Sequence, residues 1–304
     1  MSAGELVLIG VDAGGTHTTA AVADAHGTVL VRAEGGPGAV RPGDAAGAAE
    51  RIRATCADAL GKAFRDVRGD VLVVGAAGAG REEERLALQA ALEATRLAPR
   101  VLVTTDGAIA LQAAFGGGTG IVLVAGTGSI AWARLPGGET ARVGGLGPAL
   151  GDHGSGYDLG RRALRAVGLA LEDLGQATAL TDRLLRRLHL AGLDELVRWT
   201  AAADVATVAA LAAEVMEATR EGDAVAADIA AAGADELARH VRALATRFPE
   251  GRPVPLALGG GLLARAEEYR TLTVARVLAG VPAADIRADP VDAVLGAVRL
   301  ARTL

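Results

Sequence analysis

The sequence has no asparagine, one lysine, one cysteine and only 2% aromatic residues among its 304 residues. The single Cys56 excludes an intrachain disulfide and any thiolate cluster formed within one chain. No uninterrupted apolar run reaches the roughly 18 residues of a membrane-spanning helix, so no membrane span is expected. The net charge of −5 is not concentrated in a block of either sign, so no nucleic-acid partner is expected.

What the sequence does contain is apolar aliphatic residues and glycine. Hydrophobic residues make up 51% of the chain, and with so few aromatics the core must consist of Ala, Val, Leu and Ile. The chain enters a strand-like segment at Leu6–Val11 without the basic start and cleavage site of a signal peptide. We therefore expect a cytoplasmic protein, long enough for two domains or two lobes.

Short apolar segments between glycine- and proline-rich turns predict strands in the first third of the chain, and segments with helical spacing predict helices. The predicted strands are Leu6–Val11, Thr18–Asp24, Thr28–Glu34, Val71–Gly75 and Val101–Thr105. The predicted helices are Ala45–Phe64, Glu82–Arg96 and Gly107–Phe115. The glycine- and proline-rich stretch Gly35–Asp44 is predicted to be a loop.

The order strand, glycine turn, strand, turn, strand occurs twice. The second meander is predicted at Gly120–Ala125, Ile130–Leu135 and Glu139–Val143. After it, Tyr157–Phe248 is predicted to be helical almost throughout, Pro255–Leu258 to be a strand, and Asp292–Leu304 to be a final helix. The pattern predicts a duplicated α/β fold. One lobe would comprise residues 1–115 with a C-terminal helix from about 290 to 304, and the other residues 116–289 with a helical insertion.

The segment Gly10–Thr16 lies between two predicted strands and is a candidate phosphate-binding turn. Glycines there allow positive φ angles and a close approach of backbone amides to an anion. Asp12 could hold a hydrated Mg²⁺ and Thr16 could donate its hydroxyl to a phosphate, with Gly14 and Gly15 between them. No Gly-Lys-Ser/Thr follows, which excludes a P-loop, and no helix follows, which excludes a dinucleotide fingerprint. Taken alone, the segment is also compatible with an ordinary hairpin turn.

Gly126, Thr127, Gly128 and Ser129 form a second glycine–hydroxyl turn at the equivalent place in the second half. Two such turns at equivalent places in a duplicated fold are expected to face each other across a cleft and to bind a polyphosphate from both sides. This coincidence favours ligand binding over a structural role for either turn.

Three further segments are candidates for chemistry, and each has a structural alternative. Asp106 follows the predicted strand Val101–Thr105, where it could accept the proton of an attacking hydroxyl or simply cap the next helix. Asp152, in a glycine-flanked turn, could bind the hydroxyls of a polyol or cap the helical region. Gly259–Gly261 could lie against a nucleotide or form a helix-start loop. His17, His26, His189 and His240 have no metal-ligand spacing and are interpreted as structural or surface residues.

Together these segments resemble the BadF/BadG/BcrA/BcrD ATPase family, and within it the N-acetylglucosamine kinases. The similarity spans nearly the whole chain and is carried by Gly10–Thr16, Thr104–Asp106, Gly126–Ser129, Gly144–Tyr157, Leu258–Gly261 and Pro290–Ala301. It implies a duplicated actin-like (ribonuclease H-like) ATPase fold, with two lobes around a nucleotide cleft. It also implies ATP and Mg²⁺ as cofactors, a homodimer, and transfer of the γ-phosphate to a sugar 6-hydroxyl.

The resemblance also assigns roles to individual positions. Asp106 corresponds to the catalytic base and contacts the sugar, and Asp152 corresponds to a sugar-binding carboxylate. The remaining sugar-binding positions are Ser129, Gly145, Leu146 and Gly147. The ATP-binding positions are Asp12, Gly14, Gly15, Thr16, Gly126, Thr127, Gly128, Gly259 and Gly260, with Asp12 also at the metal.

Two departures affect the acceptor side of the predicted site. The loop after the third strand usually carries an Asn that hydrogen-bonds the sugar, and Ala39 stands there in this chain. Losing one polar partner costs roughly 1–3 kcal/mol, or about 5–150-fold in affinity. The usual Asp-Glu-Gly-Ser becomes Asp152-His153-Gly154-Ser155, which places a titratable imidazole beside the carboxylate.

The sequence thus predicts an ATP-dependent sugar kinase whose acceptor is N-acetylglucosamine or glucosamine. Another hexose or N-acyl sugar is an open alternative, and so is a regulator of the same family that has lost catalysis. Members that activate acyl-CoA dehydratases bridge an iron–sulfur cluster with two cysteines per chain, and the single Cys56 does not fit that arrangement.

Overall fold

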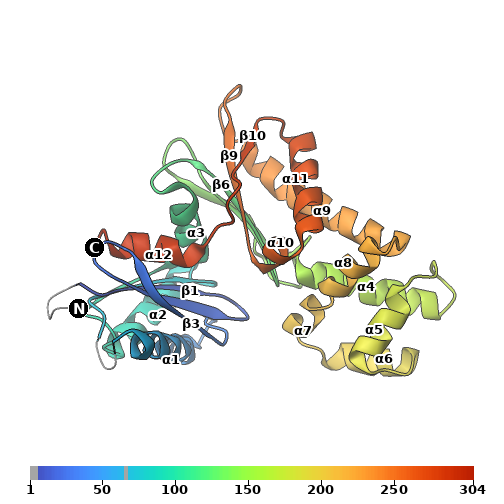
Figure 1. The fold of residues 1–304 in the computed structure, drawn as a ribbon, viewed down its shortest axis with the longest axis horizontal. Helices are drawn as coiled ribbons and strands as arrows, with labels where there is room; N and C mark the ends of the chain where they lie inside the picture. Colours follow the sequence, from blue (N-terminus) through green and yellow to red (C-terminus); the bar gives the residue numbers. More distant parts are fainter. Residues whose placement is uncertain (1–5, 65–67) are drawn as a thin grey trace. The chain divides into compact units, whose positions relative to one another are not determined.

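The computed structural model describes residues 6–64 and 68–304, and the chain divides into two compact units. Unit 1 comprises Met1–Gly118 and Val291–Leu304, and unit 2 comprises Thr119–Pro290. These limits lie close to the predicted lobes 1–115 with 290–304 and 116–289. Each unit contains one five-stranded sheet (Figure 1).

The sheet of unit 1 has the order β3-β2-β1-β4-β5. Its strands are β1 (Leu8–Ala13), β2 (Thr18–Ala23), β3 (Val29–Gly35), β4 (Val71–Ala76) and β5 (Arg100–Thr105). β1, β2 and β3 form an antiparallel meander, whereas β1, β4 and β5 run parallel. The carboxyl ends of the parallel strands therefore share one edge of the sheet.

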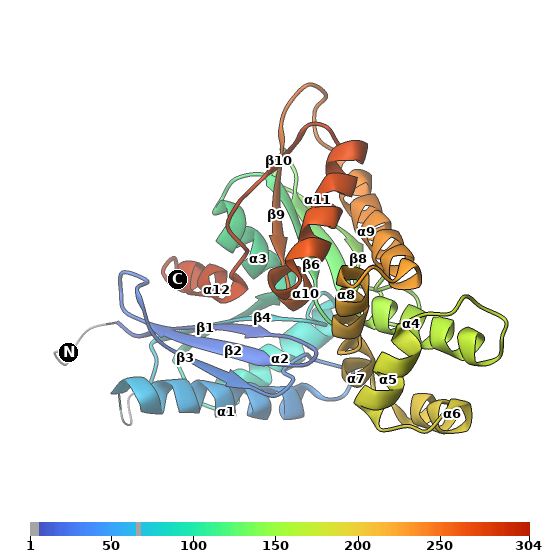
Figure 2. The same ribbon diagram turned by 45° about the vertical axis from the view of Figure 1, so that its right-hand side comes forward.

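Helices cover both faces of this sheet (Figure 2). On one face α1 (Ala45–Phe64) and α2 (Glu82–Ala94) bury Ile52, Leu88 and Leu92 against Ile9 and Val11 of β1. On the other face α3 (Asp106–Phe115) and α12 (Ala293–Ala301) bury side chains such as Ile109, Val294 and Val298. The strands alternate between these two cores, as the period of two requires.

The sheet of unit 2 has the order β10-β9-β6-β7-β8 and repeats the same plan. β6 (Gly120–Ala125), β7 (Ser129–Arg134) and β8 (Thr140–Gly144) form the meander, and β9 (Val254–Gly259) and β10 (Ala284–Ile286) run parallel to β6. The two equivalent sheets, each opening with a meander, confirm the predicted duplicated actin-like fold.

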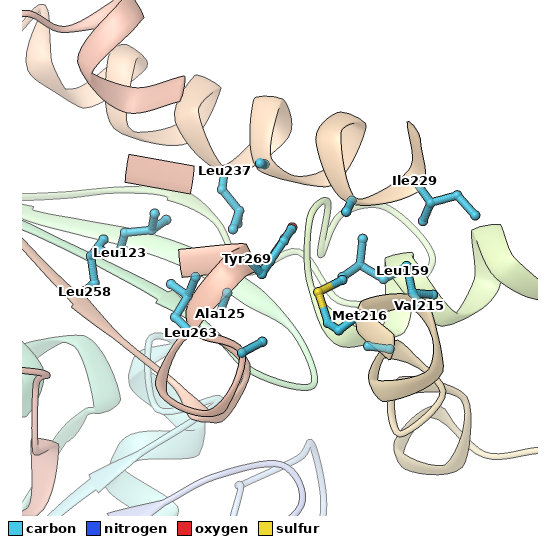
Figure 3. Close-up of a cluster of buried hydrophobic side chains, with 14 of the residues drawn as sticks. Leu123, Ala125, Leu159, Val215, Met216, Ile229, Leu237, Leu258, Leu263 and Tyr269 are labelled. Atoms are coloured by element: carbon cyan, nitrogen blue, oxygen red, sulfur yellow. The ribbon is translucent and has the colours of Figure 1, made fainter. Parts of the chain in front are cut away.

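A helical region separates β8 from β9 and supplies most of the core of unit 2 (Figure 3). Its helices are α4 (Gly156–Leu171), α5 (Leu180–Leu188), α6 (Leu193–Ala202), α7 (Val205–Ala209), α8 (Ala212–Arg220) and α9 (Ala224–Ala245). Tyr269 of α11 (Glu267–Gly280), the largest fully buried side chain, packs among Leu159, Leu237 and their neighbours. Across residues 6–64 and 68–304, no helix combines the length and the apolar character needed to cross a bilayer.

Candidate active site

Gly10 does not belong to the predicted phosphate-binding turn, because β1 extends as far as Ala13. A Cβ on Gly10 would lie 2.7 Å from both the backbone nitrogen and Cγ2 of Val298, so this glycine permits close packing of α12 on β1.

The turn itself is Gly14–His17, closed by a 2.9 Å hydrogen bond from the Gly14 amide to the His17 carbonyl. Neither Gly14 nor Gly15 adopts the positive φ that glycine allows, and a Cβ on Gly15 would meet nothing within 4 Å.

The glycine-rich loop after β3 is attached to this turn. The carbonyl of Gly14 accepts hydrogen bonds from the amides of both Gly38 and Ala39, each at 3.0 Å. Gly38 is buried, and a Cβ there would lie 2.4 Å from the Thr18 hydroxyl oxygen. The backbone at Ala39, the position expected to read the acceptor, is therefore fixed to the turn expected to bind the donor.

Asp12 and Asp106 lie at the shared carboxyl edge of the parallel strands of unit 1. Burial, and then the charges of Asp106 and Asp292, raise the pKa of the Asp12 carboxyl to about 7. A buried carboxylate that faces the negative charges of two others is stabilised in its ionised form when a cation binds beside it. The edge thus has the electrostatic character that the predicted metal site requires.

Asp106 is the first residue of α3, and it is not the N-cap. Thr105 performs that role, since its side chain accepts a 3.0 Å hydrogen bond from the Ala108 amide. The half-buried Asp106 carboxylate accepts a 2.8 Å bond from the Gly107 amide through Oδ1. Thr105 is therefore the N-cap residue of α3, while Asp106 binds one further amide of the first turn.

In unit 2 the turn Gly126–Ser129 joins β6 to β7 and is bound by the start of α4. The amide of Gly156 donates to the Gly126 carbonyl over 2.8 Å, and the amide of Tyr157 donates to the Thr127 carbonyl over 3.2 Å. These bonds occupy the first amides of α4, which otherwise have no partner within the helix. The turn is consequently held in one conformation by the helix N-terminus.

The carboxylate of Asp152 lies directly over this same turn. Its Oδ1 accepts a 3.2 Å hydrogen bond from the Ser129 amide, and a Cβ on Gly128 would lie only 2.8 Å from that oxygen. Asp152 has a φ of +58°, a conformation that non-glycine residues seldom adopt and that often marks a functional constraint. The turn that contains Asp152 does cap α4, as its structural alternative expected, but the capping side chain is Ser155, which accepts a bond from the Asp158 amide.

Burial raises the pKa of the Asp152 carboxyl, while the Ser129 amide and the imidazoles of His153 and His240 lower it.

The remaining predicted sugar-binding positions also connect through Ser129, because its carbonyl accepts a 2.9 Å bond from the Gly145 amide. Gly145 and Gly147 have φ angles of +66° and +81°, and the intervening Leu146 is exposed. Ser129 thus links Asp152 to the segment Gly145–Gly147 within unit 2.

Gly259 and Gly260 lie beside the end of β6. Gly259 pairs with Val124, and a Cβ on Gly260 would lie 2.4 Å from the Ala125 carbonyl oxygen. Gly260 has a φ of +91° and precedes the short helix α10 (Gly261–Arg265), so the helix-start interpretation describes its local structure. The structure therefore brings the proposed nucleotide positions of unit 2 together at the ends of two adjacent parallel strands, where ligands bind in open α/β sheets.

The sequence predicts a structural or surface role for His240, and the structure agrees with a structural one, because the ring is buried on α9 and Nδ1 lies 2.8 Å from the Glu236 carbonyl oxygen. What the sequence does not show is that this ring lies beside Gly144, where the predicted sugar-binding segment begins. No local pattern marks it, because its proximity depends on how α9 packs against β7 and β8.

The expectation that the two glycine turns face each other concerns the placement of the two units, and it stays a prediction. Within the described parts of the chain, no group of three or more His, Cys, Asp or Glu side chains is arranged to hold a metal ion. A divalent ion at Asp12 would therefore need water or ligand oxygens to complete its coordination, which is the usual situation for Mg²⁺. With that completion, the carboxylates of unit 1 fit such an ion.

The model of the BadF/BadG/BcrA/BcrD ATPase family matches residues 9–301. The chain belongs to this family. An N-acetylmuramic acid/N-acetylglucosamine kinase of Clostridium acetobutylicum is 28% identical over 260 residues, covering 84% of this chain and 85% of that protein. An N-acetyl-D-glucosamine kinase of Dictyostelium discoideum is 27% identical over 312 residues, covering 97% of each.

Solved structures extend the likeness to the fold. A Chromobacterium violaceum protein provisionally named an N-acetylglucosamine kinase superposes with a TM-score of 0.80 at 29% identity, over 97% of this chain and 98% of that one. A ROK family glucokinase of Streptomyces griseus, solved with glucose and AMPPNP, has a TM-score of 0.60 at 21% identity, over 98% of each chain, and shares the fold. The predicted family and fold class are confirmed.

Proposed function

We propose that this protein is an ATP-dependent kinase that transfers the γ-phosphate to the 6-hydroxyl of an amino sugar, with N-acetylglucosamine or glucosamine as acceptor. The observation that carries this proposal is the pair of carboxylates at one edge of unit 1, where Asp106 begins α3 and Thr105 is the N-cap residue. The names of the relatives support sugar phosphorylation. The relative named for N-acetylmuramic acid as well adds that N-acyl sugar to the candidate acceptors.

In the proposed reaction Asp106 accepts the proton of the acceptor hydroxyl as its oxygen attacks the γ-phosphorus. A new P–O bond forms to the sugar, the bond to the bridging oxygen of ADP breaks, and ADP leaves with that oxygen. The amides and the hydroxyl of Gly14–Thr16 and of Gly126–Gly128 would bind phosphate oxygens, and Gly259 and Gly260 would lie against the nucleoside. Mg²⁺ held at Asp12 through water would neutralise phosphate charge.

The acceptor would be held in unit 2 by Asp152 and by the segment Gly145–Gly147. An ionised carboxylate accepts hydrogen bonds from two sugar hydroxyls in fixed directions. The bond from the Ser129 amide and the left-handed φ hold the Asp152 carboxylate in place before any ligand arrives. A preformed site of this kind lowers the entropy lost on binding.

An ADP-release assay with Mg-ATP and a panel of sugars tests the proposal. The panel contains N-acetylglucosamine, glucosamine, N-acetylmuramic acid, N-acetylmannosamine and glucose, with the Asp106→Asn variant as the matched control. The 6-deoxy analogue of the best acceptor should give no turnover, because it lacks the attacking oxygen. Absence of turnover with every sugar would contradict the kinase proposal and favour a regulator without catalysis.

The alternative role as an activator with a shared iron–sulfur cluster has no support in the structure. Cys56 is fully buried in α1, and burial raises the pKa of its thiol to about 12. A thiol with that pKa does not supply the thiolate that binds iron.

We further propose that the kinase is a homodimer, which light scattering at micromolar concentration would test directly.

A further inference from the structure

The imidazole of His240 lies against the backbone at the end of β8, where the proposed acceptor-binding segment begins. A Cβ on Gly144 would lie 2.7 Å from His240 Nε2 and 2.8 Å from Cδ2. Gly144 has a φ of +82°, so both its backbone conformation and this ring demand glycine. The ring therefore covers the residue from which the backbone turns into Gly145–Gly147.

The orientation and tautomer of the ring are fixed from its other side. Nδ1 lies 2.8 Å from the carbonyl oxygen of Glu236, one helical turn earlier on α9. A carbonyl only accepts, so Nδ1 carries the proton and Nε2 presents a lone pair toward Gly144. Burial lowers the pKa of His240, with the charge of His153 acting in the same direction, which keeps this neutral form at neutral pH.

At this ring α9, which carries His240, meets Gly144 at the end of β8. Ser129 connects the end of β8 with the turn before α4, since its carbonyl accepts a bond from the Gly145 amide and its amide donates to the Asp152 carboxylate. A displacement of the ring would therefore reach both proposed acceptor-binding segments.

We propose that His240 is a positioning residue for the acceptor, which holds the backbone at Gly144 and the carboxylate of Asp152 in the arrangement that binds the sugar. The inference rests on the proposed function for the identity of the ligand. It assigns to His240 no contact with the reacting atoms. Its effect is expected on acceptor affinity and not on the donor.

Two variants of similar shape distinguish the role of Nδ1 from that of Nε2. In His240→Asn the amide can still donate to the Glu236 carbonyl, but the edge facing Gly144 is lost. In His240→Gln an amide oxygen can occupy the place of Nε2. We expect His240→Asn to raise the acceptor KM about tenfold with the ATP KM changed less than twofold, and His240→Gln to stay within about threefold of the wild type. His189→Asn is the matched control, because His189 has a left-handed φ of +56° that Asn tolerates.

Hydrogen exchange of the ligand-free protein gives a readout that does not depend on catalysis. Peptides covering residues 143–155 should exchange faster in His240→Asn than in the wild type or in His240→Gln, whereas peptides from unit 1 should be unchanged. If no sugar is turned over by the wild type, the proposed function fails, and exchange alone still decides the positioning role. If turnover is seen but both variants match the wild type in acceptor KM and in exchange, the positioning role is overturned.

If His240→Asn is too unstable to purify, a second variant tests the same proposal. Gly144→Ala presses a methyl group into the same contact from the opposite side. It should raise the acceptor KM at least as much and leave the ATP KM unchanged. An acceptor KM equal to that of the wild type, or an equal rise in both KM values, would contradict the proposal.

Discussion

Ser129 donates its hydroxyl to the backbone carbonyl of His153 over a distance of 2.7 Å. Ser129 is only 3% exposed, so its hydroxyl serves the local structure before any ligand binds. The same residue binds the Asp152 carboxylate through its amide. Ser129 therefore supports the adjacent residues Asp152 and His153, and its contact with the sugar stays a prediction.

Replacement of Ser129 by Ala should leave the His153 carbonyl without its donor. An unsatisfied buried acceptor costs about 1–3 kcal/mol, so the acceptor KM should rise by roughly 5–150-fold while the ATP KM changes little. Steady-state kinetics with each substrate varied in turn measure both constants. The control is Thr246→Ala, which removes a similar hydroxyl-to-carbonyl bond on the exposed end of α9. Equal losses for both substrates would show that Ser129 supports the whole unit.

Asp106→Asn should reduce phosphoryl transfer by about 10²–10⁴-fold, because the amide cannot accept the proton of the acceptor hydroxyl. ATP affinity, measured by titration calorimetry, should stay within a few-fold of the wild type. Asp58→Asn on the exposed face of α1, which removes the ion pair with Lys62, is the control and should retain full activity. Transfer at the wild-type rate by the Asn variant would remove Asp106 from its proposed role.

Asp12 should make the ligand-free protein less stable as the pH rises. Its pKa is about 7 in the folded state against 3.8 for the unconstrained group, so the folded state binds more protons between these values and the free energy of unfolding falls from about pH 4 to pH 7. Asp12→Asn should remove this dependence and stabilise the protein above pH 7 by about 2–4 kcal/mol. Thermal denaturation at pH 5.5 and pH 8 without Mg²⁺ measures the difference. A variant no more stable than the wild type at pH 8 would contradict the burial of this charge.

Two glycine-to-alanine substitutions should have opposite effects on stability. Gly10→Ala forces a methyl group to within 2.7 Å of α12 and should destabilise the protein by about 1–3 kcal/mol. Gly61→Ala, on α1 where a Cβ would meet nothing within 4 Å, should stabilise it by about 0.5 kcal/mol. Denaturation midpoints of the two variants measured together test the packing of α12 on β1. Equal midpoints would mean that α12 does not pack as described.

Ala39→Asn should restore a polar partner for an N-acyl or amino sugar. If the missing amide weakens acceptor binding, the KM for N-acetylglucosamine should fall by about tenfold, with the ATP KM unchanged. Ala39→Leu, which adds similar bulk without a hydrogen-bonding group, is the control and should not lower the KM. A variant with Asn that binds the sugar no better would show that the acceptor is held without this position.

The meanders and the first helices were predictable because short, strictly apolar segments alternate with glycine turns; Ala45–Phe64 was predicted with the limits observed. β10 was not predicted, since Ala284–Ile286 is too short to show a period and is defined only by its pairing with β9. α11 was likewise not predicted, although it places Tyr269 against the turn that contains Asp152, with a 2.8 Å bond to the Gly154 carbonyl. Elements of this kind are fixed by tertiary contacts.

In the candidate site, too, some residues could be predicted from the sequence and others could not. Asp106 and Asp152 were identified as chemical candidates from their places after a strand and within a glycine turn. Only the structure shows that the N-cap residues of α3 and α4 are their neighbours Thr105 and Ser155. His240 had no signal at all, because a histidine on a long apolar helix is indistinguishable in sequence from an ordinary core residue.

The Gly14 carbonyl, which receives the amides of Gly38 and Ala39, has a consequence for how such enzymes diversify. Bonds between backbone groups do not depend on the identity of the side chain at position 39. A substitution at position 39 can therefore change the side chain at the proposed acceptor site, while the turn proposed to bind the nucleotide keeps its shape. In evolution, the proposed acceptor specificity could change by single substitutions without an intermediate protein that no longer binds ATP.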